Sequence, residues 1–172
     1  MVDDGGQMTV VIRTYEPRDA EAVWALHVEA QEALGFPYDI PERDGDLRRI
    51  PEVYLGTGSH FWIAEADRRP IATVAVRRED DAAAQIKRMR VTASHRRQGL
   101  GRRLLETAET FCRENGYRRI ILDTTDRQEA AQRLYENSGY HRTGERTLDR
   151  LGLDAPNPIP GIVIFDYEKE LR

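Results

Sequence analysis

The stretch of chain that decides the fold is VTASHRRQGLGRRLL, residues 91–105. A segment over 85–91 that reads as a β-strand precedes it, and the clearest amphipathic helix of the chain begins at Leu100. A helix N-terminus presents unpaired backbone N–H groups and a partial positive charge. Gly99 and Gly101 carry no side chain that would keep a bulky anion away from those groups. The stretch therefore predicts a turn that binds a pyrophosphate.

The charge of the chain is unevenly distributed around this turn. Its 172 residues include 26 lysines and arginines against 30 acids, a formal net charge of -4, which excludes a generally basic nucleic-acid binder. Residues 82–105 nevertheless contain no acid and seven cations, of which we expect Arg96, Arg97 and Arg102 to contact the anion. Residues 63–110 contain no aromatic side chain on which a base could stack. We expect no nucleic-acid partner.

Two common nucleotide-binding motifs do not fit the turn. A P-loop requires wider glycine spacing and a following Lys-Ser or Lys-Thr pair, which the chain lacks. A dinucleotide fingerprint requires a third glycine where the chain has Leu104. The spacing thus excludes both nucleotide motifs.

Composition sets further bounds. Cys112 is the only cysteine, so neither a disulfide framework nor a cysteine-rich zinc site can form, and a reducing compartment is the default. Residues 1–8 read as a polar leader rather than a secretory signal, and no apolar run approaches the roughly 18 residues that span a bilayer. We expect a cytoplasmic protein with no membrane partner, in which residues 9–172 form a single domain.

Strand and helix patterns alternate along the chain. This alternation predicts one α/β domain whose mixed sheet carries helices on its faces. Helices are expected from near Asp19 to Gly35, from Leu100 to Gly116 and over 128–137, with a short helix around 46–53. Strands are expected over 8–13, 60–66, 70–76, 85–91, 119–123, 140–147 and 161–168, with a hairpin turn at 67–69.

Two motifs identify a family resemblance. RRQGLG, residues 96–101, matches the pattern Arg/Gln-x-x-Gly-x-Gly/Ala, and AQRLYENSGY, residues 131–140, is similar to Ala-x-x-Leu-Tyr-x-x-x-Gly-Phe. In this order and at this separation, the pair resembles the GNAT superfamily of acetyl-CoA-dependent N-acetyltransferases. The resemblance covers residues 85–140. It implies a single GNAT-type acyltransferase domain (an α+β fold), with a central mixed, mostly antiparallel sheet flanked by helices, acetyl-CoA as cosubstrate and no metal.

The resemblance also assigns roles to single residues. Tyr135 matches the tyrosine that the family often uses as general acid toward the departing thiolate. Gln128 stands where many relatives carry an asparagine, and keeps the amide. The residues implied to bind acetyl-CoA are Met89 and Val91 through their backbone, and Arg96, Arg97, Gln98, Gly99, Gly101, Arg102 and Gln128.

The general base is harder to assign, because the strand over 85–90 contains no acid. Family members often place a carboxylate on that strand or use a water. Glu79, just upstream, is the tentative base, with Asp80 beside it and Glu65 as an outside candidate. Cys112 falls on the apolar stripe of its helix, which indicates packing rather than nucleophilic chemistry.

The resulting expectation is transfer of an acetyl group from acetyl-CoA to a primary amine of a small molecule by direct attack. The alternatives are a protein or peptide acetyltransferase, or a non-catalytic CoA-binding sensor of the same fold. We expect the acceptor between the loops 36–59 and 149–160, where acids of the first loop would suit a cationic amine. A homodimer is a further expectation, because family members often pair.

Overall fold

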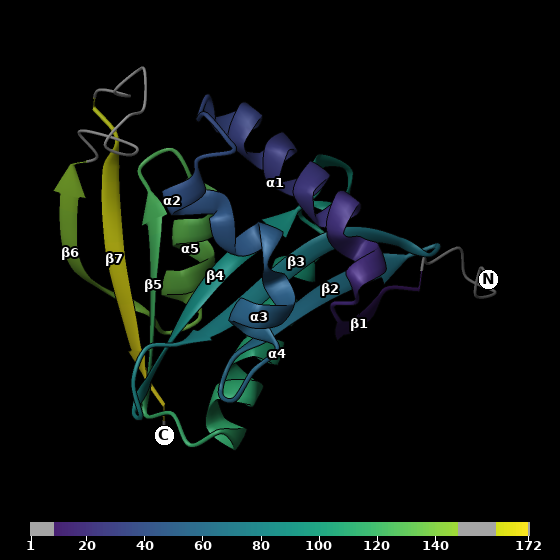
Figure 1. Cartoon of the computed structure of the whole chain (residues 1–172). Helices are drawn as coiled ribbons and strands as arrows, with labels where there is room; N and C mark the ends of the chain where they lie inside the picture. The colour runs from purple at the N-terminus through teal and green to yellow at the C-terminus, as the bar shows by residue number, and fades with distance from the viewer. Residues whose placement is uncertain (1–8, 148–160, 172) are drawn as a thin grey trace.

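The computed structural model describes residues 9–147 and 161–171, and its centre is a seven-stranded sheet in the order β1-β2-β3-β4-β5-β7-β6 (Figure 1). All neighbouring strands are antiparallel except β4 and β5, which are parallel. The predicted mixed, mostly antiparallel sheet is confirmed. The strands are β1 (Val11–Thr14), β2 (His60–Ala66), β3 (Arg69–Arg78), β4 (Ala83–Val91), β5 (Arg119–Thr125), β6 (His141–Thr147) and β7 (Val163–Glu170).

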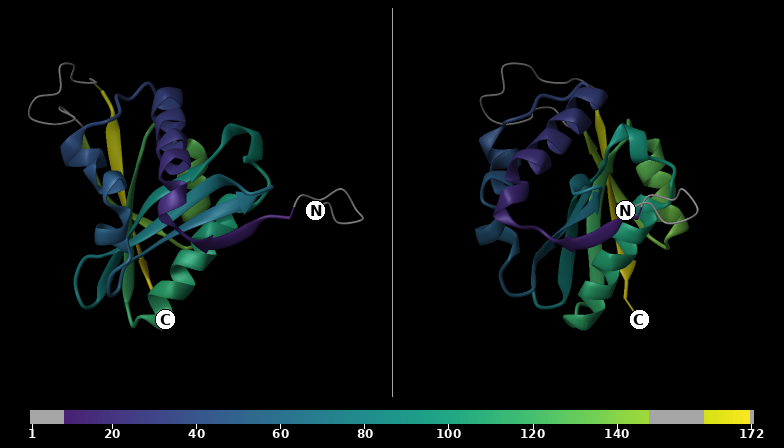
Figure 2. Two further views of the ribbon diagram at one scale, coloured as in Figure 1. Left: turned by 45° about the vertical axis from the view of Figure 1, so that its right-hand side comes forward. Right: turned by 90° about the vertical axis from the view of Figure 1, so that its right-hand side faces the viewer.

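Helices cover both faces of the sheet, as the views in Figure 2 show. One face carries α4 and α5, and the other carries α1 and the short helices that follow it. The α-helices are α1 (Ala20–Leu34), α2 (Pro41–Asp44), α3 (Ile50–Tyr54), α4 (Leu100–Glu114) and α5 (Glu129–Asn137). Three short 3-10 helices are η1 (Pro17–Asp19), η2 (Gly45–Arg48) and η3 (Ala93–His95).

The larger core lies between the sheet and α4. The predicted stripe of that helix is buried, and Leu104, Ala108 and Cys112 are completely inaccessible. Burying a leucine of this kind contributes about 1.5–3 kcal/mol relative to leaving it exposed. Burial also raises the pKa of Cys112 to about 12, so its thiol stays protonated and packs as an apolar group. Gly116, at φ 78°, follows the helix in the left-handed conformation that glycine adopts without strain.

The sheet opens between its two parallel strands. β4 and β5 pair only at Ala83–Gln85 and Arg119–Ile121, and no backbone pairing joins them beyond these residues. A bulge in β4 lies next to the opening, because the register with β3 shifts between Thr73 and Ala75 and Arg88 takes a φ of 53°. Thr73 fixes this bulge by donating its hydroxyl hydrogen to the carbonyl oxygen of Arg88 at 2.6 Å.

Several predicted boundaries change. The expected helix over 46–53 is wrong, because prolines at helix starts divide residues 41–54 into α2, η2 and α3. β1 begins at Val11 rather than at residue 8. The expected leader at 1–8 and the loop 149–160 lie outside the described residues. None of the helices in the described ranges is long and apolar enough to cross a membrane.

Candidate active site

A cavity of about 1200 Å³ occupies the opening between β4 and β5. Residues 85–91 of β4 form one wall, and residues 123–131, around the end of β5 and the start of α5, form the opposite wall. The C-terminal part of α1 and the turn that precedes α4 complete the lining. The cavity therefore joins the predicted pyrophosphate turn to the helix that carries Tyr135.

The N-terminus of α4 is free to bind an anion. Gly99 is its N-cap residue, with a φ of 77°, and no side chain caps the helix. The first backbone N–H within this end that finds a partner belongs to Arg103, which donates to the carbonyl of Gly99 at 3.1 Å. A Cβ on Gly101 would lie 3.4 Å from Cδ2 of Leu134 and 3.6 Å from Cε of Met89, within the cavity wall. An added Cβ would be in ordinary van der Waals contact with both side chains, so glycine keeps bulk off the cavity wall beside the free N–H groups, which can bind a pyrophosphate.

The polar residues of this turn divide into two groups. Arg96 and Arg97 line the cavity, and Arg96 is oriented by a bond from its Nε to the carbonyl of Val91 at 3.1 Å. Gln98 and Arg102 are not among the lining residues. Gln98 donates to the carbonyl of Ser94, and Arg102 pairs with an acid one helical turn later on the solvent side. The predicted contacts of Gln98 and Arg102 therefore have no support in the geometry of the turn.

The strand and the helix N-cap bring the other predicted residues to the cavity. Met89 and Val91 line it from β4, where the backbone has no partner strand on the β5 side. Gln128 lines it from the start of α5. The side-chain oxygen of Gln128 accepts bonds from Thr124 Oγ1 at 3.2 Å and from the backbone N–H of Thr125 at 3.3 Å. Gln128 thus holds the turn between β5 and α5 as well as facing the cavity.

Tyr135 projects from α5 into the same cavity and is buried. Its hydroxyl contacts the sulfur of Met89 at 3.8 Å, and its ring packs edge-on against Tyr140 with 5.8 Å between ring centres. Burial raises the pKa of Tyr135 to about 12, although the charge of Arg90 acts in the opposite direction. The phenol therefore keeps its proton throughout the neutral range.

The family model for the acetyltransferase (GNAT) family matches residues 20–140, which include the turn, β4 and the helix that carries Tyr135. The chain belongs to the GNAT acetyltransferase family. Human N-acetyltransferase 8 is 36% identical over 106 residues, a match that covers 58% of this chain and 47% of the human protein. The chain spans about half the length of the curated relatives that it matches.

Solved structures of the family share this fold. A GNAT acetyltransferase from Staphylococcus aureus Mu50 has a TM-score of 0.80 and 25% identity, covering 95% of this chain and 100% of that one. A GNAT acetyltransferase from Elizabethkingia anophelis, solved with acetyl-CoA bound, has a TM-score of 0.65 and 18% identity over 94% of this chain and 98% of its own. The predicted GNAT fold is confirmed.

The carboxylates near this GNAT cavity are not those expected from the sequence. Glu79 is not among the lining residues, since it sits in the exposed turn after β3 and pairs with Arg77 at 2.8 Å. Asp123 and Glu42 do line the cavity. The charge of Asp123 also raises the pKa of Tyr135, after the larger effect of burial, and its carboxylate pairs with Arg146 at 3.0 Å. The sequence placed Asp123 at the end of a strand, but not beside β4.

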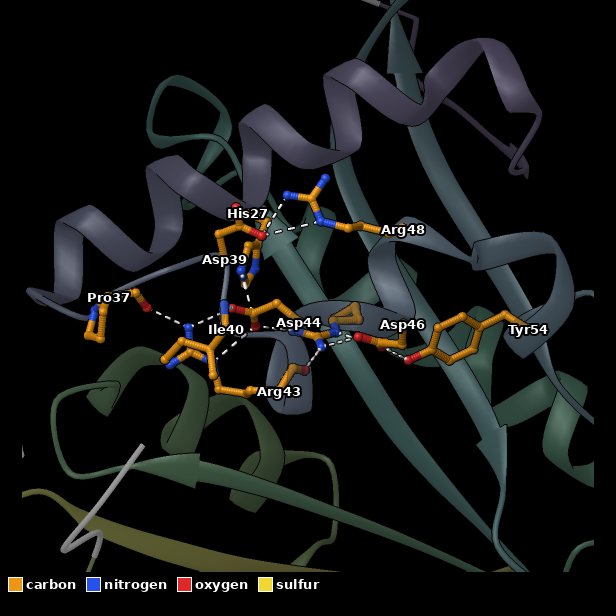
Figure 3. Close-up of polar contacts among 10 residues, drawn as sticks. His27, Pro37, Asp39, Ile40, Arg43, Asp44, Asp46, Arg48 and Tyr54 are labelled. Atoms are coloured by element: carbon orange, nitrogen blue, oxygen red, sulfur yellow. Dashed lines mark hydrogen bonds and ion pairs between the residues drawn. The ribbon is translucent and has the colours of Figure 1, made fainter. Parts of the chain in front are cut away.

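The acids of the loop over 36–59 are mostly paired, as Figure 3 shows. Asp44 lies 2.8 Å from Arg43 and 3.2 Å from Nε2 of the buried His27. Asp46 accepts bonds from Arg88 and from the Tyr54 hydroxyl. Burial alone would raise the pKa of Asp44, but its basic neighbours hold that pKa well below its usual range. We call the five residues His27, Asp44, Asp46, Tyr54 and Arg88 the α2–η2 cluster. Its acids are satisfied by the chain itself rather than left free for a cationic acceptor.

Proposed function

We propose that this protein transfers the acetyl group of acetyl-CoA to the primary amine of a small molecule. The observation that carries the proposal is the continuous cavity between β4 and β5. One end of it meets an uncapped helix N-terminus with Arg96 and Arg97, and its wall carries the protonated phenol of Tyr135. An anion-binding end joined to a proton donor is the arrangement that acyl transfer from a phosphate-bearing thioester requires.

Residues of the turn and of β4 would hold acetyl-CoA, which supplies an acetyl group activated as a thioester. The N-terminus of α4, with Arg96 and Arg97, would bind its pyrophosphate. The backbone of β4 after Gln85 has N–H and C=O groups that β5 does not pair, and these could bind an amide-containing arm along the strand. Met89 and Val91 are in this stretch. The unpaired backbone of β4 supports the sequence-based prediction that these two residues bind acetyl-CoA through their main chain.

Tyr135 would act as the general acid. A thiolate leaving group has a conjugate acid of pKa about 8.5, lower than the pKa of Tyr135, so the phenol would stabilise the departing sulfur by donating a hydrogen bond. Its proton would pass to the sulfur in the step in which the attacking amine gives up a proton. The raised pKa of Tyr135 ensures that this proton is present at neutral pH. The hydroxyl contacts only the sulfur of Met89 among the described side chains, so it is available for this transfer.

Asp123 would act as the general base in place of Glu79. It is a carboxylate that lines the same cavity as Tyr135, and its exposed pair with Arg146 leaves it able to take the proton of the attacking amine directly or through one water. Cys112 of α4 is completely buried and is not a lining residue, which supports direct attack by the amine rather than an acetyl-cysteine intermediate. A single domain over 9–172, a homodimer and a cytoplasmic location stay predictions from the sequence.

The test is the release of CoA thiol from acetyl-CoA across a panel of amines, peptides and polyamines. We expect turnover with at least one small amine. Tyr135→Phe should lower kcat about 10²- to 10⁴-fold, the usual contribution of a general acid, while acetyl-CoA affinity and thermal stability stay near the wild-type values. Phe111→Tyr, on the partly buried side of α4 and outside the cavity, is the matched control. Acetyl-CoA binding without turnover on any amine would favour the sensor, and turnover only on peptides would favour the peptide acetyltransferase.

A further inference from the structure

One arginine of the cavity, on β4, combines the lack of an acidic partner with a buried nitrogen that makes no hydrogen bond. Arg90 lies on β4 just after the bulge and lines the cavity. Its Nη1 donates to the carbonyl of Met89 at 2.9 Å, whereas its Nε is inaccessible and has no hydrogen-bond partner. Within residues 9–147 and 161–171, no carboxylate forms an ion pair with it. Arg90 thus presents a guanidinium whose binding capacity the described chain does not use.

Arg88, two positions earlier on β4, differs from Arg90 because acids of the chain pair with it. Arg88 donates to Asp46 at 2.9 Å and lies 3.5 Å from Asp44, so the nearby acids are already occupied. Burial lowers the pKa of Arg90 to about 10, with Arg88 acting in the same direction, and the side chain is still cationic at neutral pH. An unpaired buried charge is costly, and an anionic ligand would remove that cost.

We propose that the acceptor amine also bears a carboxylate, and that Arg90 binds this carboxylate. The inference rests on the proposed function and names its substrate class: a free amino acid rather than a peptide N-terminus or a polyamine. The planar guanidinium matches a carboxylate in two parallel hydrogen bonds. Arg90 and Tyr135 line the same cavity and both contact Met89, so a carboxylate held by Arg90 places the adjacent amine at the reacting end.

The charges around Arg90 agree with an anionic group and oppose a polyamine. Lys87 also lines the cavity, and the described residues provide it with no ion pair either. The acids expected to attract a cationic acceptor, Asp44 and Asp46, are bound to arginines. The cavity also carries acids such as Glu42 and Asp123, but no ion pair in the described residues joins them to Lys87 or Arg90, so these two cations remain for an anionic group on the acceptor.

The experiment compares amino acids with their carboxamides, such as phenylalanine with phenylalaninamide, in which only the carboxylate is changed. Wild-type protein should prefer the acid of its best pair about 10- to 100-fold in kcat/KM, the range expected for a hydrogen-bonded buried charge. Arg90→Gln should reduce this ratio to near one, and Arg90→Lys should keep part of it. Calorimetric titration of the amino acid into protein saturated with CoA should show the same order of affinities without turnover.

Arg96→Gln is the matched control, since it should weaken acetyl-CoA binding without changing the acid-to-amide ratio. Equal use of acid and amide by the wild type, or an unchanged ratio in Arg90→Gln, would overturn the inference. So would an equal loss of kcat on both substrates, which would assign Arg90 to the thiolate or Tyr135. A protein that acetylates only peptides or polyamines contradicts the inference and leaves acetyl transfer intact, whereas failure to bind acetyl-CoA removes both.

Discussion

Two cationic regions near the C-terminal end of β4 differ in whether acids of the chain pair with their arginines. In the α2–η2 cluster, Arg88 is buried with carboxylates on all three of its nitrogens, and the acids are in turn bound by other basic or hydroxyl groups. In the turn before α4, Arg96 and Arg97 are exposed on the cavity, and the helix N-terminus beside them has no cap. Both regions contribute to the same cationic window of sequence. Only the partners distinguish a structural arginine from one that binds a ligand.

The largest expected effect is a loss of unfolding free energy when the paired arginine of the α2–η2 cluster is removed. Arg88→Met leaves Asp46 and Asp44 buried without their cation, and removing one partner of a buried ion pair costs about 3–5 kcal/mol of unfolding free energy. Urea denaturation monitored by circular dichroism measures this loss. Arg97→Met, at an exposed position, should change the unfolding free energy by less than about 0.5 kcal/mol. A comparable loss in both variants would show that the two regions are equivalent.

The pH dependence of the unfolding free energy tests whether the basic neighbours of Asp44 hold it ionised. The pKa of Asp44 is lower in the folded chain than in the unfolded chain, so its stabilisation is complete above the ordinary carboxyl pKa of about 3.9 and is lost as pH falls. Asp44→Asn should therefore cost about 1.5–3 kcal/mol at pH 7, and this difference should shrink below about pH 4. Urea denaturation at a series of pH values measures it. A difference that stays constant down to pH 3 would show that Asp44 is not held ionised by its neighbours.

Substitution of an arginine in the turn before α4 should change acetyl-CoA affinity rather than stability. Arg96→Gln removes a charge-assisted contact to the pyrophosphate and should weaken acetyl-CoA binding about 10-fold, with an unchanged unfolding free energy. Calorimetry with acetyl-CoA gives the affinity. Arg102→Gln is the matched control, because Arg102 pairs with Glu106 and does not line the cavity. If Arg102→Gln weakens binding as much as Arg96→Gln, then the division of the turn into two groups is wrong.

Local sequence patterns predicted the turn, the helix after it and the position of Tyr135, because a strand end, two glycines and an apolar stripe are encoded by adjacent residues. The α2–η2 cluster was out of reach, since Arg88 meets Asp46 across 42 positions of sequence. The contact of Arg88 depends on the bulge in β4, and no glycine or proline in that strand marks the bulge in the sequence. Asp123 was missed for a similar reason. Its strand was predicted, but its place beside β4 follows from the parallel pairing of β4 and β5.

Glu79, the base predicted from the sequence, does not line the cavity because of where β3 ends. Glu79 is only six residues from Gln85, but β3 continues to Arg78, so Glu79 falls in the turn at the far end of β4. There it pairs with Arg77 instead of facing Tyr135. Proximity in sequence to the phosphate turn therefore did not translate into proximity in space.

The most direct test of the account is acetyl-CoA binding by Gly101→Val, measured by calorimetry against the wild type and against Thr110→Val. The wild type should bind, and Gly101→Val should lose detectable affinity, because its side chain would enter the space between Leu134 and Met89 at the N-terminus of α4. Thr110→Val, on the exposed side of the same helix, should bind as the wild type does. Full acetyl-CoA affinity in a folded Gly101→Val protein would contradict the assignment of this helix N-terminus as the pyrophosphate site.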